Sequence, residues 1–374
     1  MASTDPSLTA AINPRVRKSP FFDATVEDGL TSVTSYNHMW MPTGYGDPEA
    51  EYQRLTEAVS QWDVAAQRQI EVRGPDADAL VQLVTAVDTS AVEPGRGTYA
   101  PIVDFDGTLI NDPVLLRLDD GTWRFSISDA DVRLWVDAIR GARSLEARVR
   151  ELDTATLAVQ GPRADDVLRA LGCSWAEDLP YFGRRATEIG DSAVVVSRSG
   201  WSTQGGYELF LDDPSTALDL WAAVREAGQP SGIGPGCPNQ PERIENVLMS
   251  YGTDTGFDAN PLEVGLEAHL DLDGDAFVGQ EALVAVREEG PERRLLGSVA
   301  SGEPIEGFGH PVALDVGGRT VGQLRAAAWS PRFARNLGLA LVDAACTVGA
   351  EGTVHTQGEQ RSVHLVELPF EDGL

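Results

Sequence analysis

Residues 198–211 read R-S-G-W-S-T-Q-G-G-Y-E-L-F-L and join two predicted strands. The β-branched run 192–196 precedes them, and residues 207–211 begin the second strand. A hairpin needs only two to five connecting residues, so this longer connection, with a Trp and a Gly-Gly pair, suits a loop that wraps a ligand. The same residues also fit a glycine-rich turn in which Trp201 packs on the core. Without the rest of the chain, this second interpretation is favoured over a ligand-binding loop.

The totals describe a globular protein with room for more than one core. With 374 residues and 42% hydrophobic residues, the chain can form two or three domains. No apolar run is long enough to span a membrane, and the first residues lack the pattern of a secretory signal. Three scattered cysteines fit a reducing compartment, so we expect a cytoplasmic protein.

The chain is strongly acidic, with a formal net charge of −29. Such a surface repels phosphate backbones and anionic lipids, so nucleic acids and membranes are disfavoured as partners. Lys18 is the single lysine, and every other basic residue is arginine. High acid content with almost no lysine suggests adaptation to salt, although a GC-rich genome would also favour arginine.

Two similar units suggest a duplicated α+β element. A strand at residues 69–73 leads through Gly74-Pro75 into a helix at 76–84. Another strand, at 156–160, leads through Gly161-Pro162 into a helix at 164–171. We further predict a hairpin turning at Asp106-Gly107, together with the elements that follow: a strand at 123–128, helices at 47–61, 130–140, 216–227 and 242–251, and a loop at 232–241.

Composition divides the chain into three parts. Residues 1–20 are polar and interrupted by proline, which predicts a flexible arm. Residues 21–290 hold the α+β elements. Around residue 290 the chain turns to glycine, proline and charge, and six short predicted strands follow, so we expect 291–374 to form a small β-barrel or sandwich.

The usual catalytic and metal-binding motifs are missing from the sequence. Residues 232–236 do not have dinucleotide-loop spacing, and residues 271–275 lack the order of a calcium loop. Histidines and cysteines show no zinc spacing, and no nucleophile elbow occurs. An enzyme with this sequence would need no metal, no flavin and no common protein nucleophile.

Seven segments together resemble the glycine-cleavage T-protein superfamily of tetrahydrofolate-dependent aminomethyl- and methyltransferases. They occur in family order from about residue 30 to the end of the chain. The segments are Tyr99-x-Pro101; Asn111-Asp112; Arg198-Ser199-Gly200-Trp201 through Gly206-Tyr207-Glu208; Arg243-x-Glu245 with Tyr251-Gly252-x-Asp254; Asn260-Pro261-Leu262-Glu263-x-Gly265-Leu266; Phe277-x-Gly279-x-Glu281-x-Leu283; and Ser330-Pro331.

Within the superfamily, the chain is most similar to the dimethylsulfoniopropionate demethylases. The pieces that carry this likeness are Tyr36-Asn37-His38-Met39, residues 62–69, residues 199–208 and residues 234–239. T-proteins usually have a folate-contacting arginine four residues before the arginine of the R-x-E motif. Asn239 stands there in this chain, which counts against aminomethyltransferase activity.

The resemblance implies an α+β fold: a three-lobed ring with ferredoxin-like lobes, a C-terminal barrel, and folate in a central cavity. It implies that Glu208 binds the pterin N–H groups, whereas by itself Glu208 reads as a strand residue. Asp112 matches the catalytic-loop aspartate, with a turn before Pro113 as the alternative. The implied roles are catalytic for Asp112 and Tyr207, folate-binding for Glu208, Tyr99, Arg198, Gly206 and Arg243, and donor-binding for Trp201, Tyr36, Trp40 and Ser202.

The implied reaction is methyl transfer from dimethylsulfoniopropionate to N5 of tetrahydrofolate. Aromatic faces would hold the cationic donor, and Arg198 is a candidate partner for its carboxylate. Alternatives are a different donor, such as a methylated amine or an aryl methyl ether; aminomethyl transfer; and a non-catalytic folate-binding regulator. That last class typically has a K-G-C-[Y/F] signature, absent at residues 276–281. Besides a small-molecule donor, the expected partner is at most a second copy in a homodimer.

Overall fold

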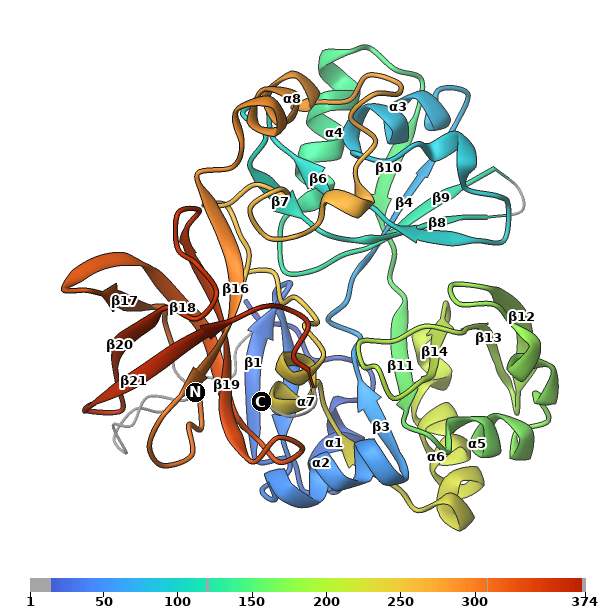
Figure 1. Cartoon of the computed structure of the whole chain (residues 1–374). Coiled ribbons are helices and arrows are strands. Elements are labelled where there is room, and N and C mark those ends of the chain that lie inside the picture. Colours follow the sequence, from blue (N-terminus) through green and yellow to red (C-terminus); the bar gives the residue numbers. More distant parts are fainter. Residues whose placement is uncertain (1–14, 119–120, 308, 372–374) are drawn as a thin grey trace.

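Three lobes surround a common centre in the computed structural model, which describes residues 15–118, 121–307 and 309–371 (Figure 1). Two lobes are α+β and the third is a closed barrel, so the predicted α+β fold with a small C-terminal barrel is confirmed. In the described ranges, no helix is both long and apolar enough to cross a membrane.

The first lobe, at the top of Figure 1, is built on a five-stranded sheet of order β10-β4-β9-β8-β5. Helices α3 and α4 cover one face, and Val72, Leu80 and Val136 belong to the buried core there. The elements are β4 (Gln69–Arg73), α3 (Ala77–Val84), β5 (Gly97–Tyr99), the ribbon β6 (Ile102–Val103) and β7 (Leu109–Asn111), β8 (Val114–Arg117), β9 (Trp123–Ser126), α4 (Val132–Ala142), β10 (Arg148–Glu151) and the later α8 (Gln280–Glu289).

The second lobe is built on a six-stranded sheet of order β12-β13-β14-β11-β3-β15. Leu157, Leu209 and Val224 belong to its buried core, between the sheet and helices α5 and α6. The elements are α1 (Phe22–Glu27), the hairpin β1 (Ser32–Tyr36) and β2 (Met39–Gly44), α2 (Pro48–Glu57), β3 (Val59–Asp63), β11 (Ala155–Gln160), α5 (Ala164–Ala170), β12 (Arg184–Ile189), β13 (Ser192–Ser197), β14 (Gly206–Leu211), α6 (Ala217–Gly228), β15 (Ile233–Gly236) and α7 (Gln240–Glu245).

The duplicated strand–Gly-Pro–helix unit is present once in each of the two α+β lobes, as β4–α3 in the first and β11–α5 in the second. Gly74 and Gly161 have φ angles of 131° and 130°. A Cβ at Gly74 would lie 2.6 Å from the Glu146 carbonyl oxygen, and a Cβ at Gly161 would lie 2.6 Å from that of Ala58. Both turns therefore need glycine, for its backbone conformation and for the close approach of a neighbouring chain.

The third lobe is a barrel in which β16, β19, β18, β17, β20 and β21 pair in a closed order. Its strands are β16 (Arg293–Ala300), β17 (Val312–Val316), β18 (Arg319–Ser330), β19 (Arg335–Asp343), β20 (Glu351–Thr356) and β21 (Glu359–Val366). Helix α7 lies between this barrel and the second lobe, where Ile244 packs with Ala326 and Leu339. The barrel thereby supports the loop that follows α7.

Several predicted boundaries were wrong. The predicted helix 47–61 ends at Glu57, because the chain passes into β3, whose polar Ser60 and Gln61 are buried. The predicted loop 232–241 contains β15, which pairs parallel with β3. The predicted helix 242–251 begins at Gln240 and ends at Glu245, since Val247 has a φ of 56°.

The predicted flexible arm 1–20 lies outside the described residues up to residue 14. Beyond that point it is wrong, because the chain is anchored. Arg17 forms a β-bridge with Met39, and the Ser19 hydroxyl donates to the buried carboxylate of Asp63. Phe21 is fully buried in the second-lobe core.

Candidate functional site

A cavity of about 200 Å³ lies on the face of the second-lobe sheet opposite helices α5 and α6. Glu208 on β14, Ala158 on β11 and Trp62 on β3 form one row across it, because Ala158 pairs directly with both neighbours. The short Ala158 side chain leaves a hollow between the carboxylate and the indole. All three residues line the cavity.

The other cavity walls come from distant parts of the chain. Tyr36 and Met41 come from the β1–β2 hairpin, Gln67 and Ser128 from the first-lobe side, and Trp201 from the loop before β14. The segment after α7 contributes Met249, Ser250 and Tyr251. Of the described lining residues, Glu208 is the one with a carboxyl group, and none has a basic side chain.

Glu208 is a buried carboxylate, with 7% of its surface exposed. Oε2 accepts a hydrogen bond from the Ser199 hydroxyl at 2.5 Å. Burial raises the pKa of Glu208, and the Ser199 hydrogen bond partly opposes that shift. Oε1 makes no hydrogen bond within the described residues, so this oxygen is open to a donor in the cavity.

A second acidic group lies behind the cavity wall. Asp112 follows β7; its Oδ2 accepts from the Tyr99 hydroxyl at 2.5 Å and its Oδ1 from the Ser128 hydroxyl at 2.7 Å. Burial raises the pKa of Asp112 to about 6, against the lowering effect of these two hydrogen bonds. Ser128 lines the cavity, so its hydroxyl connects Asp112 to the enclosed space.

Tyrosines surround Asp112. Burial, and then the negative charge of Asp112, raise the pKa of Tyr99, Tyr36 and Tyr251 above the ordinary value. These hydroxyls therefore stay protonated at neutral pH. The arrangement is a carboxylate among neutral hydrogen-bond donors, which can accept a proton near neutral pH.

The loop between β13 and β14 is held on one side by Gln160. Its Nε2 donates to the Ser199 carbonyl at 3.1 Å, and its Oε1 accepts from the Ser202 hydroxyl at 2.8 Å. A Cβ at Gly200 would lie 2.1 Å from this amide, and a Cβ at Gly206 would lie 2.7 Å from its Nε2. The two glycines therefore make room for Gln160.

Glu242 of α7 holds the same loop on the other side. Its Oε1 accepts from the backbone N–H and the hydroxyl of Thr203, and from Nε2 of Gln204, at 2.9–3.0 Å. Between the two anchors, Trp201 reaches the cavity and donates from Nε1 to the Met249 carbonyl at 3.2 Å. The loop thereby joins β14 to the segment after α7.

Three of the predicted site residues line the cavity: Glu208, predicted to bind folate, and Tyr36 and Trp201, predicted to bind the donor. Asp112 lies behind the wall, and Tyr99 reaches Asp112 with its hydroxyl rather than lining the cavity itself.

Tyr207 and Arg198 do not face the cavity, so their predicted placement was wrong. Successive strand residues point to opposite faces, so Tyr207 turns into the second-lobe core while Glu208 turns into the cavity. The Tyr207 hydroxyl donates to Asp165 on α5 at 2.5 Å. The Arg198 guanidinium donates to the carbonyls of Glu177 and Leu179, and therefore braces a loop.

The same correction applies to four further residues. Trp40 is buried and alternates along β2 with Met41, which is the residue that lines the cavity. Arg243 donates to Asp254 at 2.6 Å, and both side chains are almost fully buried. Ser202 and Gly206 contact Gln160 instead of the cavity.

Sequence reasoning missed Trp62, Ala158, Ser128 and Met249 as wall residues. Trp62 and Ala158 follow from the position of Glu208 once the strand order is known, but strand order is not visible in the sequence. The available signal was the Trp62-Asp63-Val64 segment, which contributed to the family likeness. Tyr251 belonged to a quoted motif without an assigned role.

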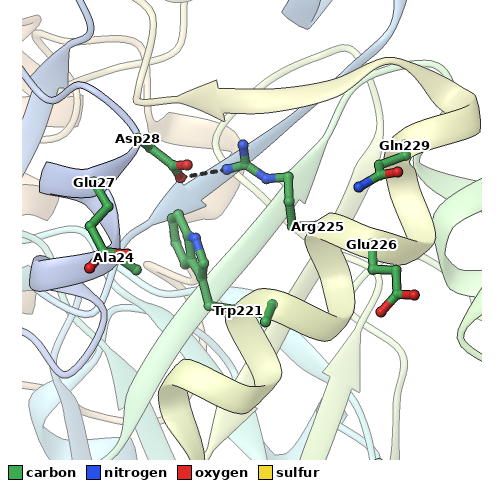
Figure 2. A pocket seen from close by; sticks show the side chains of 8 residues that line it. Ala24, Glu27, Asp28, Trp221, Arg225, Glu226 and Gln229 are labelled. Atoms are coloured by element: carbon green, nitrogen blue, oxygen red, sulfur yellow. Dashed lines mark hydrogen bonds and ion pairs between the residues drawn. The ribbon is translucent and has the colours of Figure 1, made fainter.

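A larger hollow, of about 370 Å³, lies on the outer surface between α1 and α6 (Figure 2). The Arg225 guanidinium lines this hollow but already has partners within the protein. It donates to Asp28 at 2.7 Å and to Gln61 at 2.9 Å. Glu27 and Glu226 lie at its rim. The site at the centre of the ring is the better candidate, because the buried carboxyl group of Glu208 lines it and one of its oxygens makes no hydrogen bond within the described residues.

In the described residues, no three His, Cys, Asp or Glu side chains are arranged to hold a metal ion. The site is a partly open aromatic cavity with one buried carboxyl group in its wall and a second behind that wall. Such a site defines a protein that encloses small organic molecules.

Comparison with known proteins gives the family. Residues 21–274 match the GCVT N-terminal domain, and residues 293–372 match the glycine cleavage T-protein C-terminal barrel domain. The chain belongs to the glycine-cleavage T-protein family. It is a tetrahydrofolate-dependent methyl- or aminomethyltransferase, which confirms the predicted family, enzyme class and cofactor.

The chain is 36% identical over 344 residues to the dimethylsulfoniopropionate demethylase of Ruegeria pomeroyi, covering 92% of each protein. It is 31% identical over 373 residues to an aminomethyltransferase of Symbiobacterium thermophilum, covering 96% of this chain and 98% of that protein. The crystal structure of aminomethyltransferase T from Bartonella henselae has the same fold, with a TM-score of 0.84 at 21% identity over 95% of this chain and 98% of that one.

Proposed function

We propose that this enzyme transfers a methyl group from dimethylsulfoniopropionate to N5 of tetrahydrofolate, giving methylmercaptopropionate and 5-methyl-tetrahydrofolate. One observation carries the proposal. The cavity has aromatic walls from Tyr36, Trp62, Trp201 and Tyr251, and among its described lining residues none is basic and Glu208 has the one carboxyl group. A sulfonium cation suits such walls, at ~0.5–2 kcal/mol for each aromatic face.

The residues also fit tetrahydrofolate. Glu208 lines the cavity, and its Oε1, which makes no hydrogen bond within the described residues, can accept from pterin N–H groups, while the aromatic walls suit a flat ring. The cavity of about 200 Å³ is smaller than the ~300–1,000 Å³ of a typical ligand pocket. We therefore expect it to enclose the ring end, with the folate tail extending outward.

Bound tetrahydrofolate would supply at N5 the electron pair for the new bond to the methyl carbon, and N5 would release its proton. The carbon–sulfur bond breaks with its electrons left on sulfur, which becomes a neutral thioether. Asp112 receives the released proton, connected to the cavity by the Ser128 hydroxyl. With a pKa of about 6, this carboxyl is ionised at neutral pH and can act as the base.

Positioning is the other contribution of the protein. The loop anchored by Gln160 and Glu242 fixes Trp201 on one side of the cavity, and the β1–β2 hairpin fixes Tyr36 on another. Holding donor and acceptor in line lowers the barrier by up to ~7–11 kcal/mol. For the donor carboxylate, the cavity offers neutral donors on Gln67 and Ser250.

Two observations bear on the alternatives. Asn239, at the position where T-proteins usually have an arginine, caps α7 by accepting from the Glu242 N–H at 3.1 Å. Its side chain is thus engaged, which supports methyl transfer over aminomethyl transfer. The aromatic walls would accept a quaternary ammonium as readily as a sulfonium, so a methylated amine is the second candidate donor.

The test is incubation of the full chain with tetrahydrofolate and dimethylsulfoniopropionate, with both products quantified. We expect methylmercaptopropionate and 5-methyl-tetrahydrofolate in equal amounts. Parallel reactions contain glycine betaine or a methoxyarene as donor. Turnover of either with none of dimethylsulfoniopropionate would replace the proposed donor, and folate binding without turnover of any donor would favour aminomethyl transfer.

A further inference from the structure

Asn37 occupies the turn of the β1–β2 hairpin, in a backbone conformation that few residues tolerate. Tyr36 pairs with Met39, so Asn37 and His38 alone form the turn, with φ angles of 48° and 57°. A two-residue turn with both φ angles positive matches the twist of a hairpin, and asparagine is among the residues that accept it. The turn explains the backbone, but not why the Asn37 side chain is buried.

The buried side chain joins three separate segments. Its Nδ2 donates to the Ala66 carbonyl at 3.0 Å and to the Ser128 carbonyl at 3.2 Å. Its Oδ1 accepts from the Ala130 N–H at 3.1 Å. The Asn37 backbone N–H donates to Asp129 at 2.7 Å. Asn37 therefore holds residues 128–130 from three directions.

This contact lies directly behind the site. The Ser128 hydroxyl donates to Asp112 at 2.7 Å, and the Ser128 N–H donates to Asn111 at 3.1 Å. Tyr36, the residue before Asn37, lines the cavity beside Ser128. The position of one amide thus determines the position of two wall residues that face Asp112.

We propose that Asn37 is a positioning residue, which holds Ser128 and Tyr36 against Asp112 and thereby keeps that carboxyl ready to accept the proton released in methyl transfer. The inference rests on the proposed function for the role of Asp112. It assigns a task to the Tyr36-Asn37-His38-Met39 segment that the fold alone does not require, since glycine would satisfy the same turn.

The charges around Asp112 set the direction of the expected effect. The carboxyl is faced by Tyr99, Tyr36 and Tyr251, and its pKa is raised mainly by burial and to a smaller extent by Asp254. The Ser128 hydrogen bond lowers its pKa. Loss of that bond therefore raises the pKa, and the base becomes ionised only at a higher pH.

The experiment measures kcat against pH for wild type, Asn37→Gly, Ser128→Ala and the double variant. Asn37→Gly keeps the turn and removes the three amide hydrogen bonds. We expect kcat to fall about tenfold and the acid midpoint to rise by about one pH unit. Ser128→Ala should raise the midpoint similarly, and the double variant should add nothing, because both changes remove one connection.

His38→Gly is the matched control. His38 shares the turn, but its side chain is exposed and pairs at the surface with Asp131. We expect its pH profile to match that of the wild type. A further variant, Asn37→Asp, keeps the size and turn preference but places an oxygen opposite the two carbonyls, so we expect its kcat to fall at least as far as that of Asn37→Gly.

A wild-type midpoint in Asn37→Gly, with only a lower melting temperature, would show a purely structural role. An additive shift in the double variant would show that Asn37 does not act through Ser128. The profile is measured with whichever donor the wild type demethylates, so rejection of dimethylsulfoniopropionate leaves the test intact. Infrared titration of the Asp112 carboxyl, identified by subtraction of Asp112→Asn spectra, reports the same shift without any donor.

Discussion

Glu208 and Ala158 lie directly opposite each other on the antiparallel strands β14 and β11, and this pairing creates the hollow of the site. The carboxylate extends over the space that a larger residue at 158 would occupy. Trp62 closes the row on the other side of Ala158. The cavity therefore depends on a missing side chain as much as on the groups that line it.

Ala158→Leu should fill this hollow. We expect tetrahydrofolate affinity to fall at least tenfold in isothermal titration calorimetry, because the added carbons occupy the ligand space. Added carbons in a packed core cost ~1–3 kcal/mol in the free energy of unfolding, and because the hollow can take part of the new side chain we expect a loss at the lower end of that range. Ala193→Leu, on the exposed face of β13, is the control and should bind normally. Unchanged affinity in Ala158→Leu would place the folate elsewhere.

Glu208→Gln should weaken tetrahydrofolate binding by roughly 10- to 100-fold. A hydrogen bond to a charged group contributes about 1.5–3 kcal/mol. The glutamine amide of the variant accepts hydrogen bonds less strongly than a carboxylate, and its NH₂ group would be placed against the N–H donors of the pterin. Calorimetry at pH 7.5 measures the loss. The exposed Glu188→Gln on β12 is the matched control. Equal affinity of Glu208→Gln and wild type would remove Glu208 from the pterin site.

The pH dependence of turnover should report Asp112. Its pKa is raised by burial to about 6, so the base is ionised above that pH and protonated below it. We expect kcat to fall tenfold per pH unit below about pH 6. Asp112→Asn should lose roughly 10²–10⁴-fold in kcat and lose this acid limb. A variant that keeps full turnover would show Asp112 to be structural.

Glu242→Ala should loosen the loop that carries Trp201. The variant removes the acceptor of three hydrogen bonds from Thr203 and Gln204. We expect the KM for the methyl donor to rise at least tenfold, while tetrahydrofolate affinity changes less, because Glu208 lies in the strand beyond the loop. Glu226→Ala, on the surface of α6, is the control. Parallel loss of donor and folate binding would contradict a separate role for the loop.

Salt should stabilise the protein. At a net charge of −29, acidic side chains repel one another, and this repulsion is screened at high ionic strength. We expect the melting temperature to rise between 0.1 and 2 M KCl. A melting temperature that is no higher in molar salt would remove the idea of salt adaptation.

The sequence predicted most long elements, because strands such as 192–196 and helices such as 216–227 carry their own periodicity. The sequence did not predict β3 or β15. Ser60 and Gln61 are polar residues in β3, and Gly234 and Pro235 are unusual within a strand such as β15. Both segments become strands because they pair with each other in the completed sheet.

The site was predicted in part for the same reason. Motif likeness identified Glu208, Tyr36 and Trp201, each on a segment with a recognisable pattern. Strand alternation would have excluded Tyr207 as a partner of Glu208 in one cavity, because adjacent strand residues point to opposite faces. Trp62 and Ser128 reach the cavity through pairing and loop packing between distant segments, which no local pattern in the sequence reveals.

The contact of Gln160 with Gly200 and Gly206 also constrains how the loop can evolve. A side chain at either glycine would overlap the Gln160 amide, and a smaller residue at 160 would leave Ser202 and the Ser199 carbonyl without their partner. Single substitutions at these positions are therefore expected to be deleterious, and tolerated changes should occur together. We therefore expect the loop that carries Trp201 to change only as a unit, and new donor specificities to arise elsewhere on the cavity wall.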